Sequence, residues 1–233
     1  LLTLGNGSTI IRNDGTNLTG NAPIGGAYNL IYNGTLYSSE PVASGNINDL
    51  TNNLTGTLTI AGNIAAVGDI LNQAGTFASV ANTISCSDLT NNAIWDSPST
   101  ILTLTGNLAN NGTFNHNSGT VVFNGTGSTI TGTVLFNHIT ISGTLVGPNT
   151  LTLVGNFTNN GTFTPGSAGT VAFNGSTIQN IQGTTNTAFR NISINNTLAA
   201  VRVGGSQRLL GTLTLAANTN FDPDGAAKLR GQH

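Results

Sequence analysis

Apolar and polar residues alternate with period two along most of this chain, which is the spacing of a half-buried β-strand. Leu102 and Leu104 face one side of such a strand, whereas Thr103 and Thr105 face the other. The short apolar runs end at Gly-Asn, Asn-Asn-Gly or Asn-Gly-Thr, which make tight corners because these residues tolerate left-handed backbone angles. The pattern therefore predicts many short strands, each with one face in a core and one face in water.

The stretch from Ile101 to Thr197 contains two copies of one phrase. Residues 102–114 return as 151–163, an offset of 49 residues, and residues 119–125 and 136–142 return as 169–175 and 189–195. Each copy contains about three strand-and-turn modules of 14 to 20 residues, a spacing that suits one coil of a β-solenoid. We therefore predict an all-β fold, a right-handed parallel β-solenoid or β-helix with short coils, with a β-sandwich as the alternative.

The clarity of the repeat divides the chain into three predicted segments. Residues 57–216 carry the regular solenoid repeats. Residues 1–56 repeat less cleanly, and we expect atypical N-terminal coils there that act as a cap or docking surface, because a terminal repeat lacks one neighbour. Residues 217–233 break the pattern, and we expect a C-terminal tail or docking segment there.

Composition narrows the class of protein. Thr, Asn and Gly together account for 102 of the 233 residues, so the chain is poor in helix formers and long helices are not expected. The regularly spaced apolar residues, 37% of the chain, argue against disorder. Only 6% of residues are charged, and no basic cluster with interleaved aromatics is present, which excludes a nucleic-acid partner. No apolar run is long enough to span a bilayer.

The most regular part of the chain lacks the charged side chains that catalysis requires. Residues 97–189 contain no Asp, Glu, Lys or Arg, whereas glycoside hydrolysis needs two facing carboxylates. Asp222 and Asp224 form the one close acidic pair, which we interpret as a turn, and Asp88 and Asp96 are candidates for neighbours on adjacent coils. We expect no enzyme activity and no catalytic residues.

Histidine, cysteine and tryptophan are the remaining residue types that could contribute a reactive or binding group. His116 and His138 are too few for a metal site, and we interpret them as polar ladder residues, so neither a metal nor a cofactor is expected. Cys86, the single cysteine, is expected to be a buried and unreactive thiol. Trp95, the single tryptophan, is expected to fill the core or a corner.

Five Thr-x-Thr pairs raise an alternative function. If the pairs stack on a flat face, their hydroxyl and methyl groups form the regular grid that ice-binding solenoids use, although threonine also simply suits an outward strand position. The pairs are Thr57/Thr59, Thr103/Thr105, Thr129/Thr131, Thr150/Thr152 and Thr212/Thr214. Ice binding is the less favoured of the alternatives.

Charge is distributed unevenly along the chain. The first hundred residues contain six acidic residues against Arg12, a net charge of −5, whereas the residues from Arg190 onward contain five basic residues against two acidic ones, a net charge of +3. Complementary ends favour a head-to-tail contact, which generates an open filament when it does not close by rotation. We predict strand addition between residues 1–11 and residues 212–229, through Leu2, Leu4, Ile10, Leu213, Leu215, Phe221 and Leu229.

The Asn-x-Ser/Thr triplets add one candidate modification. Asn111 and Asn160 each begin an Asn-Gly-Thr corner, and exposed corners of this kind are acceptors for N-linked glycans in an exported protein.

Residues 155–175, with their partner at 106–125, resemble the repeats of large exported microbial surface proteins of the β-solenoid, adhesin-like class. The resemblance covers about residues 57–216 and implies an extracellular or cell-surface scaffold with no shared catalytic residues. The chain also begins directly in the strand pattern, without a basic signal-like start, so we expect a processed product. The predicted function is a structural extracellular protein that self-assembles head to tail into a filament or surface appendage. The alternative is a carbohydrate-binding adhesin module that contacts surface glycans.

Overall fold

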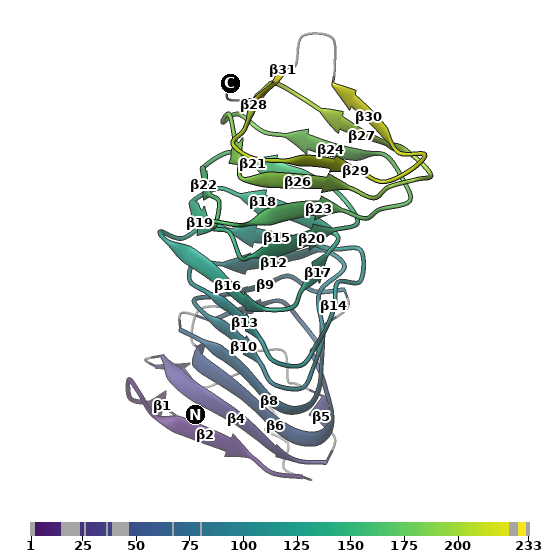
Figure 1. The fold of residues 1–233 in the computed structure, drawn as a ribbon. Coiled ribbons are helices and arrows are strands. Elements are labelled where there is room, and N and C mark those ends of the chain that lie inside the picture. Colours follow the sequence, from purple (N-terminus) through teal and green to yellow (C-terminus); the bar gives the residue numbers. More distant parts are fainter. Residues whose placement is uncertain are drawn as a thin grey trace. The chain divides into compact units, whose positions relative to one another are not determined.

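The computed structural model describes residues 3–14, 24–25, 27–35, 37–38, 47–66, 68–79, 81–223 and 228–231. These residues form strands and turns, with no helix among them. The chain divides into two compact units, Leu1–Gly119 (unit 1) and Thr120–His233 (unit 2). In each unit the described strands pair in parallel and stack coil upon coil, which confirms an all-β parallel β-solenoid (Figure 1). The β-sandwich alternative is wrong, because such sandwiches are built from antiparallel sheets. The right-handed winding stays a prediction.

Unit 1 contains a long β2 sheet, a short β7 sheet and a two-stranded sheet of β1 and β3. The β2 sheet runs β2-β4-β6-β8-β10-β13, with β5 beside β6 and with β8 also leading to β11 and β14; the β7 sheet runs β7-β9-β12. The strands are β1 (Thr3–Leu4), β2 (Thr9–Arg12), β3 (Ile24–Gly25), β4 (Tyr28–Gly34), β5 (Tyr37–Ser38), β6 (Ile47–Thr59), β7 (Ile64–Ala65), β8 (Ile70–Ala78), β9 (Ile84–Cys86), β10 (Leu89–Asn91), β11 (Ile94–Asp96), β12 (Ile101–Leu104), β13 (Leu108–Asn110) and β14 (Thr113–Asn115).

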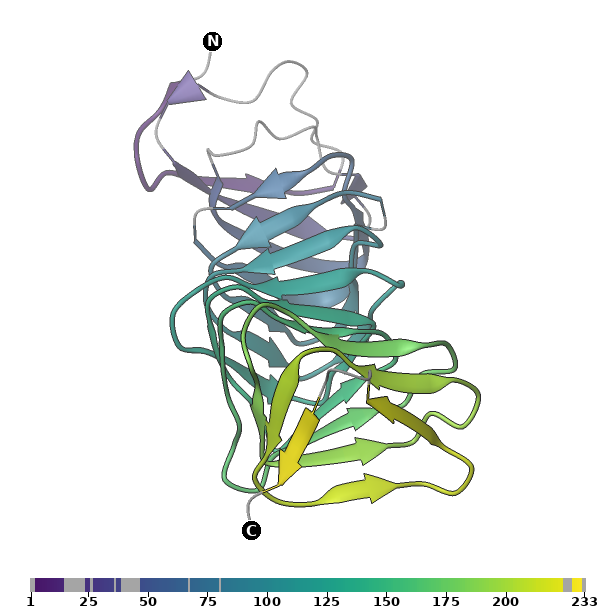
Figure 2. The same cartoon turned by 90° about the horizontal axis from the view of Figure 1, so that it is seen from above.

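Unit 2 contains four sheets, each named by its first strand: β15-β18-β21-β24-β27-β30, β16-β19-β22, β17-β20-β23-β26-β29 and β25-β28-β31. The strands are β15 (Thr120–Phe123), β16 (Ser128–Gly132), β17 (Leu135–Phe136), β18 (His138–Ile141), β19 (Thr144–Val146), β20 (Thr150–Leu153), β21 (Phe157–Asn159), β22 (Thr162–Thr164), β23 (Thr170–Phe173), β24 (Gln179–Gln182), β25 (Ala188–Phe189), β26 (Asn191–Ile194), β27 (Ala200–Val203), β28 (Ser206–Leu209), β29 (Leu213–Leu215), β30 (Asn220–Pro223) and β31 (Lys228–Gly231). Each complete coil carries three strands that lie in three of these sheets, for example β18, β19 and β20. Figure 2 looks onto the last coils, whose yellow strands run along three sides.

Period-two alternation builds the core of each coil. In unit 2, Phe136, Leu153, Phe173 and Ile194 pair in register across four coils, and each is 0% exposed. The polar residues between them face outward, as the alternation predicts. Because each coil buries its apolar side against the coils before and after it, an inward-facing residue depends on both neighbours for burial.

The repeated phrase in the sequence is not the repeat of the coils. Ile139 of β18 pairs with Phe157 of β21, so one coil here takes 18 residues, and 49 residues do not make a whole number of coils. The copied segments consequently fall on different sheets: β15 and its copy β23 lie in the β15 sheet and the β17 sheet. What the sequence duplicates is a strand-and-corner module, and any of the three sides can accept it.

Corner glycines have a different role from the one the sequence predicts. Gly112 and Gly161 end the two Asn-Asn-Gly corners, and neither has a positive φ. A Cβ on Gly161 would collide with the carbonyl oxygen of Gly143 in the neighbouring coil, and a Cβ on Gly112 would collide with that of Ala93. The same carbonyls accept hydrogen bonds from the next residue along, for example from the Thr162 N–H to Gly143 at 2.8 Å. Close stacking of coils, rather than a left-handed backbone, therefore requires glycine at these corners.

Candidate functional site

The last described coil of unit 2 leaves its inward-facing apolar residues uncovered. Leu215 pairs in register with Ile194 but is 51% exposed, whereas Ile194 is 0% exposed. Leu213 and Phe221 are half-buried, although their register partners Ile192 and Val201 are fully buried. We call Leu213, Leu215 and Phe221 the open end of unit 2. Three of the predicted self-association residues thus lie on one coil and face its interior.

Strand edges accompany the open end. Among the described strands, β29, β30 and β31 are each the outermost strand of their sheet, so each presents one backbone edge that pairs with no described strand. An unpaired edge is a template for the addition of another strand. The same residues therefore offer apolar side chains and backbone hydrogen-bonding groups together.

Unit 1 has its own outermost strand, β2, at the edge of the β2 sheet. Ile10 faces inward opposite Leu30 and is half-buried, and Ile11 faces outward with 54% of its surface exposed. Of the other predicted contact residues, Leu4 lies in β1 and Leu229 in β31, whereas Leu2 lies outside the described residues.

A buried asparagine ladder runs through unit 1, and the sequence analysis missed it. Each Nδ2 donates to the Oδ1 of the next coil at 2.7 Å: Asn52 to Asn72, Asn72 to Asn91, and Asn91 to Asn110. Asn91 Nδ2 also donates to the Thr113 carbonyl at 2.9 Å. All four side chains are at most 5% exposed. Their spacing of 19 or 20 residues is the signal that could have identified them.

A partly exposed carboxylate column, made of Asp49, Asp69 and Asp88, runs along the starts of β6, β8 and β10 in the same sheet. The Oδ1 atoms of Asp49, Asp69 and Asp88 accept the backbone N–H groups of Asp69, Asp88 and Asn107 in the next coil, at 2.8, 3.0 and 2.6 Å. These carboxylates therefore hold the backbone of adjacent coils together. The expectation that Asp88 and Asp96 meet on adjacent coils is wrong. Asp88 directly precedes β10 and Asp96 ends β11, and both strands pair with β8, so the two residues lie on one coil.

The histidines also bond to backbone groups. His138 Nδ1 accepts the Asn156 N–H of the next coil at 2.9 Å, and His116 Nδ1 accepts the Ser118 N–H of its own turn at 3.0 Å. No group of three or more His, Cys, Asp or Glu side chains in the described ranges is placed to hold a metal ion. Of the predicted acidic pair, Asp222 is described and lies 3.7 Å from Arg202, with both side chains half exposed.

Cys86 and Trp95 occupy the core of unit 1, as predicted. The Cys86 thiol is buried, and burial, followed by the nearby carboxylates of Asp69 and Asp88, raises its pKa well above the ordinary value. The Trp95 ring is fully buried and stacks on Phe77 with ring centroids 4.3 Å apart. The low thiolate fraction makes Cys86 a poor nucleophile in the folded state.

The threonine pairs do not all lie on one sheet. Thr57/Thr59 lie on β6, Thr103 on β12, Thr129/Thr131 on β16 and Thr150/Thr152 on β20. In the β17 sheet, Thr150 stacks on Thr170 but then on Asn191, and Thr152 stacks on Ala172. A two-column grid of threonines does not extend from coil to coil on this sheet.

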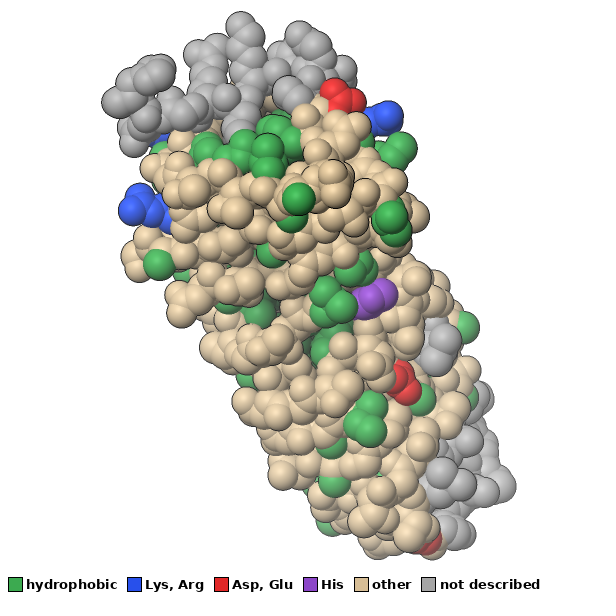
Figure 3. Space-filling view, turned by 45° about the vertical axis from the view of Figure 1, so that its right-hand side comes forward, with side chains coloured by type: hydrophobic (Ala, Val, Ile, Leu, Met, Phe, Trp, Pro, Cys, Tyr) green, Lys and Arg blue, Asp and Glu red, His purple; other side chains and the backbone are tan. Residues whose placement is uncertain are grey.

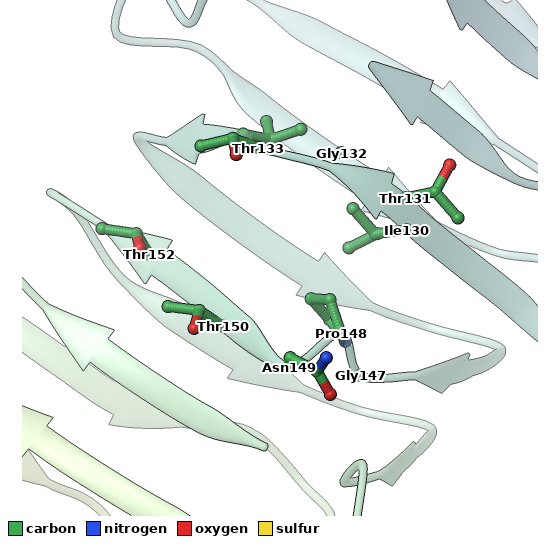
Figure 4. A pocket seen from close by; sticks show the side chains of 10 residues that line it. Ile130, Thr131, Gly132, Thr133, Gly147, Pro148, Asn149, Thr150 and Thr152 are labelled. Carbon is green, nitrogen blue, oxygen red and sulfur yellow. The ribbon is translucent and has the colours of Figure 1, made fainter. Parts of the chain in front are cut away.

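A shallow groove of about 500 Å³ opens on unit 2 between two neighbouring coils. Figure 4 shows one wall formed by β16 and the residues that follow it, and the other formed by the turn before β20 and by β20 itself. Thr131, Thr133, Asn149, Thr150 and Thr152 supply the polar groups, and Ile130, Val134 and Pro148 the apolar surface. The groove carries no charged side chain, so its chemistry suits a neutral polar ligand.

The predicted glycan acceptors are both exposed. Asn111 Nδ2 donates to Asn92 Oδ1 at 2.9 Å, whereas Asn160 uses its Oδ1 to accept the Thr184 N–H at 3.0 Å. Glycosylation at both positions stays a prediction.

Uncharged polar groups dominate the surface. On the face shown in Figure 3, charged side chains are few and scattered among uncharged polar side chains and backbone. The charges nevertheless separate by unit, because the acidic excess of the first hundred residues falls in unit 1 and the basic excess from Arg190 onward falls in unit 2.

Comparison of the chain with protein-family models, with curated proteins and with solved structures gives no match. Within the described ranges, no helix has the length and apolar character needed to cross a membrane.

Proposed function

We propose that this protein is a structural subunit that joins end to end with further copies of itself to build a filament or surface appendage. The observation that carries the proposal is the open end of unit 2, where Leu213 and Leu215 continue columns that are fully buried in the preceding coils. A further coil stacked on this end would bury them as the earlier coils bury Ile192 and Ile194. We propose that a second copy of this chain supplies such a coil.

The strand edges and the charges support a head-to-tail joint. β2 of one copy offers an edge with Ile10 and Ile11, and β29, β30 and β31 of the next copy offer edges around the open end. The acidic excess of unit 1 and the basic excess of unit 2 attract each other across such a joint and disfavour contacts between like ends. A heterologous contact of this kind propagates as a filament when it does not close.

The ladders support a scaffold role. In unit 1 the inward-facing asparagines bond to one another, and the aspartates of the carboxylate column accept hydrogen bonds from the backbone of the next coil. These polar groups therefore already have a structural role. Such a chain gains rigidity from each added coil. We further propose that the protein acts outside the cell or at its surface, as an adhesin-like exported microbial protein, because its repeats resemble that class and its surface depends on amides and hydroxyls for solubility.

A pair of variants on one strand tests the joint. Leu215 faces inward on β29, whereas Thr214 next to it faces outward opposite Ser193. Sedimentation velocity of the full chain across a concentration series should show growing oligomers for the wild type and for Thr214→Asp, and a single small species for Leu215→Asp. Equal association of both variants, or a wild type that sediments as one copy at every concentration, overturns the proposal.

The groove of unit 2 favours a second candidate function, binding of neutral glycans by an adhesin module. Its hydroxyl and amide groups match the donors and acceptors of a neutral sugar. Binding of neutral oligosaccharides that is lost in Thr150→Val/Thr152→Val but kept in Thr170→Val would support this function. Absence of binding by the wild type to any neutral oligosaccharide removes it.

A further inference from the structure

Asparagine followed by glycine occurs six times in the described part of the chain, and five of these asparagine side chains are held by a hydrogen bond to a neighbouring coil. Three of the five accept at Oδ1 from another coil's backbone or amide group, namely Asn6 from the Ala27 N–H, Asn33 from Asn53 and Asn160 from the Thr184 N–H. The other two belong to surface amide ladders, with Asn111 donating to Asn92 at 2.9 Å and Asn174 accepting from Asn195 at 2.7 Å.

Asn124 is the exception. Its side chain is exposed and makes no hydrogen bond to any described residue. The reason lies in the next coil, where the residue stacked on Asn124 is Ser142, whose side chain is too short to continue an amide ladder.

The duplicated phrase supplies a matched comparison within unit 2. Residues 136–142 correspond to 189–195, so Ser142 corresponds to Asn195, and Asn124 corresponds to Asn174. The backbone geometry is the same at both places: Ser142 N–H donates to the Phe123 carbonyl at 2.8 Å, and Asn195 N–H donates to the Phe173 carbonyl at 2.9 Å. The side chain that would hold the asparagine differs. The following glycine differs as well, because the buried Gly175 N–H donates to Gln179 Oε1 at 2.8 Å, whereas Gly125 is only half-buried.

We propose that Asn124 is a site of spontaneous covalent modification, at which the side-chain amide is converted to a carboxyl group. The backbone nitrogen of Gly125 forms a bond to Cγ of Asn124, the bond from Cγ to the amide nitrogen breaks, and ammonia leaves with the proton released by the Gly125 nitrogen. Water then opens the resulting five-membered imide at either carbonyl and leaves aspartate or isoaspartate.

Two features of the site favour this reaction. Glycine at position 125 has no Cβ, so its nitrogen is open to approach and its backbone can adopt the required angles. The free side chain of Asn124 can rotate to bring Cγ toward that nitrogen, whereas a ladder bond opposes the same rotation in Asn174. The stacking of the coils, rather than the Asn-Gly dipeptide itself, therefore determines which asparagine is converted first.

The product changes the chain locally. A carboxylate at position 124 introduces a negative charge into residues 97–189, which contain no charged Asp, Glu, Lys or Arg side chain. Isoaspartate also adds a methylene group to the main chain at the corner between β15 and β16, beside the Gly125 carbonyl that accepts the Thr144 N–H at 2.7 Å. Modification should therefore loosen this corner as well as charge it.

Peptide mapping by mass spectrometry of the folded full chain, aged at mildly alkaline pH, tests the proposal. Asn124 should be converted first, and Ser142→Asn should slow its conversion about fivefold, the equivalent of a hydrogen bond of about 1 kcal/mol. The reciprocal variant Asn195→Ser should accelerate conversion of Asn174, but to a rate below that of Asn124, because Gln179 still holds the Gly175 N–H. Circular dichroism confirms that each variant is folded before ageing.

Two results would contradict the proposed modification of Asn124. If Asn124 is converted no faster than Asn174 in the wild type, the proposal is wrong. If Asn124 is converted but Ser142→Asn leaves its rate unchanged, the ladder is not what protects the other asparagines, and the proposal is equally overturned. Ageing of the unfolded chain should abolish the difference between Asn124 and Asn174, because no coil stacking remains.

Discussion

Asn52, Asn72, Asn91 and Asn110 face the interior of unit 1, where each amide is buried and bonded to the coils beside it. A buried amide costs free energy unless its donors and acceptor are satisfied. Adjacent coils are close enough for the amide of one asparagine to donate to the amide oxygen of the next, so each asparagine satisfies a hydrogen-bonding group of its neighbour. Residue identity at this position is therefore set by stacking and not by the corner alone.

Replacement of a middle rung measures the worth of the ladder. Asn91→Ala removes the bonds to Asn110 and Thr113 and leaves one N–H of the Asn72 amide without its acceptor, so we expect a loss of about 2–4 kcal/mol in the free energy of unfolding. Asn92→Ala removes exposed amide bonds to Gln73 and Asn111, whose groups remain open to water, so it should cost less, about 1 kcal/mol or below. Urea denaturation checks both values, and equal losses would contradict a special role for the buried ladder.

The buried thiol of Cys86 predicts a dependence of stability on pH. Burial holds the pKa of Cys86 above its ordinary value of 9.0, so the folded state keeps a proton that the unfolded state loses. The free energy of unfolding should be unaffected below that value and should fall as the pH rises above it, because the unfolded state then binds fewer protons.

Denaturant unfolding over a pH series checks this expectation, with Cys86→Ala as the control. Burial also raises the pKa of Tyr28 above its ordinary value of 10.0, so its contribution begins at higher pH and remains in the variant. The wild type should lose stability just above pH 9 while Cys86→Ala does not. An identical pH dependence for the two proteins would refute the assignment.

Among the structural elements, the strands are predicted well from the sequence. Leu102 and Leu104 are buried while Thr103 between them is half-exposed, as period two requires. The sheet to which a strand belongs is not local information. β15 and β23 share a sequence pattern but lie in different sheets, because the number of residues in each coil, 18 between Ile139 and Phe157 but 24 between Phe157 and Ile181, sets the stacking.

Local sequence pattern, which predicts strands but not their stacking, also explains which candidate residues could be predicted from the sequence. The alternation identified Leu213 and Leu215 as inward-facing, and the end of the repeat suggested that they are uncovered. The asparagine ladder escaped because asparagine normally indicates a corner, and only the spacing between distant asparagines distinguishes a buried rung. Asp88 and Asp96 were misplaced because the seven residues between them include a corner within one coil.

Corner glycines give a prediction at this scale. Gly112→Ala places a Cβ against the Ala93 carbonyl of the adjacent coil, so we expect a loss of about 1–3 kcal/mol in the free energy of unfolding. Gly62→Ala, where no atom lies within 4 Å of the added Cβ, should be neutral or slightly stabilising. Thermal denaturation of the two variants checks the difference, and a neutral Gly112→Ala would show that the coils can separate at the corner.

At the scale of the whole molecule, two kinds of interaction are expected to act in the proposed joint. Leu213, Leu215 and Phe221 supply apolar area, and the opposite net charges of units 1 and 2 supply orientation. Apolar burial determines strength, whereas charge between exposed surfaces is screened by salt and mainly affects the rate and direction of association.

Salt therefore separates the two contributions. Raising the ionic strength from about 0.05 M to about 0.5 M should slow assembly by shortening the range of attraction, while filaments already formed should persist. Light scattering after mixing at each salt concentration follows the rate. Assembly that is faster at high salt would show that the charges of the two units do not guide the joint.

Negative-stain electron microscopy of the purified chain tests the central claim most directly, beside the double variant Leu213→Asp/Leu215→Asp. We expect long, uniform filaments for the wild type and isolated particles for the variant, because two carboxylates replace the apolar residues Leu213 and Leu215 of the open end. Isolated particles of a single copy in both samples would contradict end-to-end assembly.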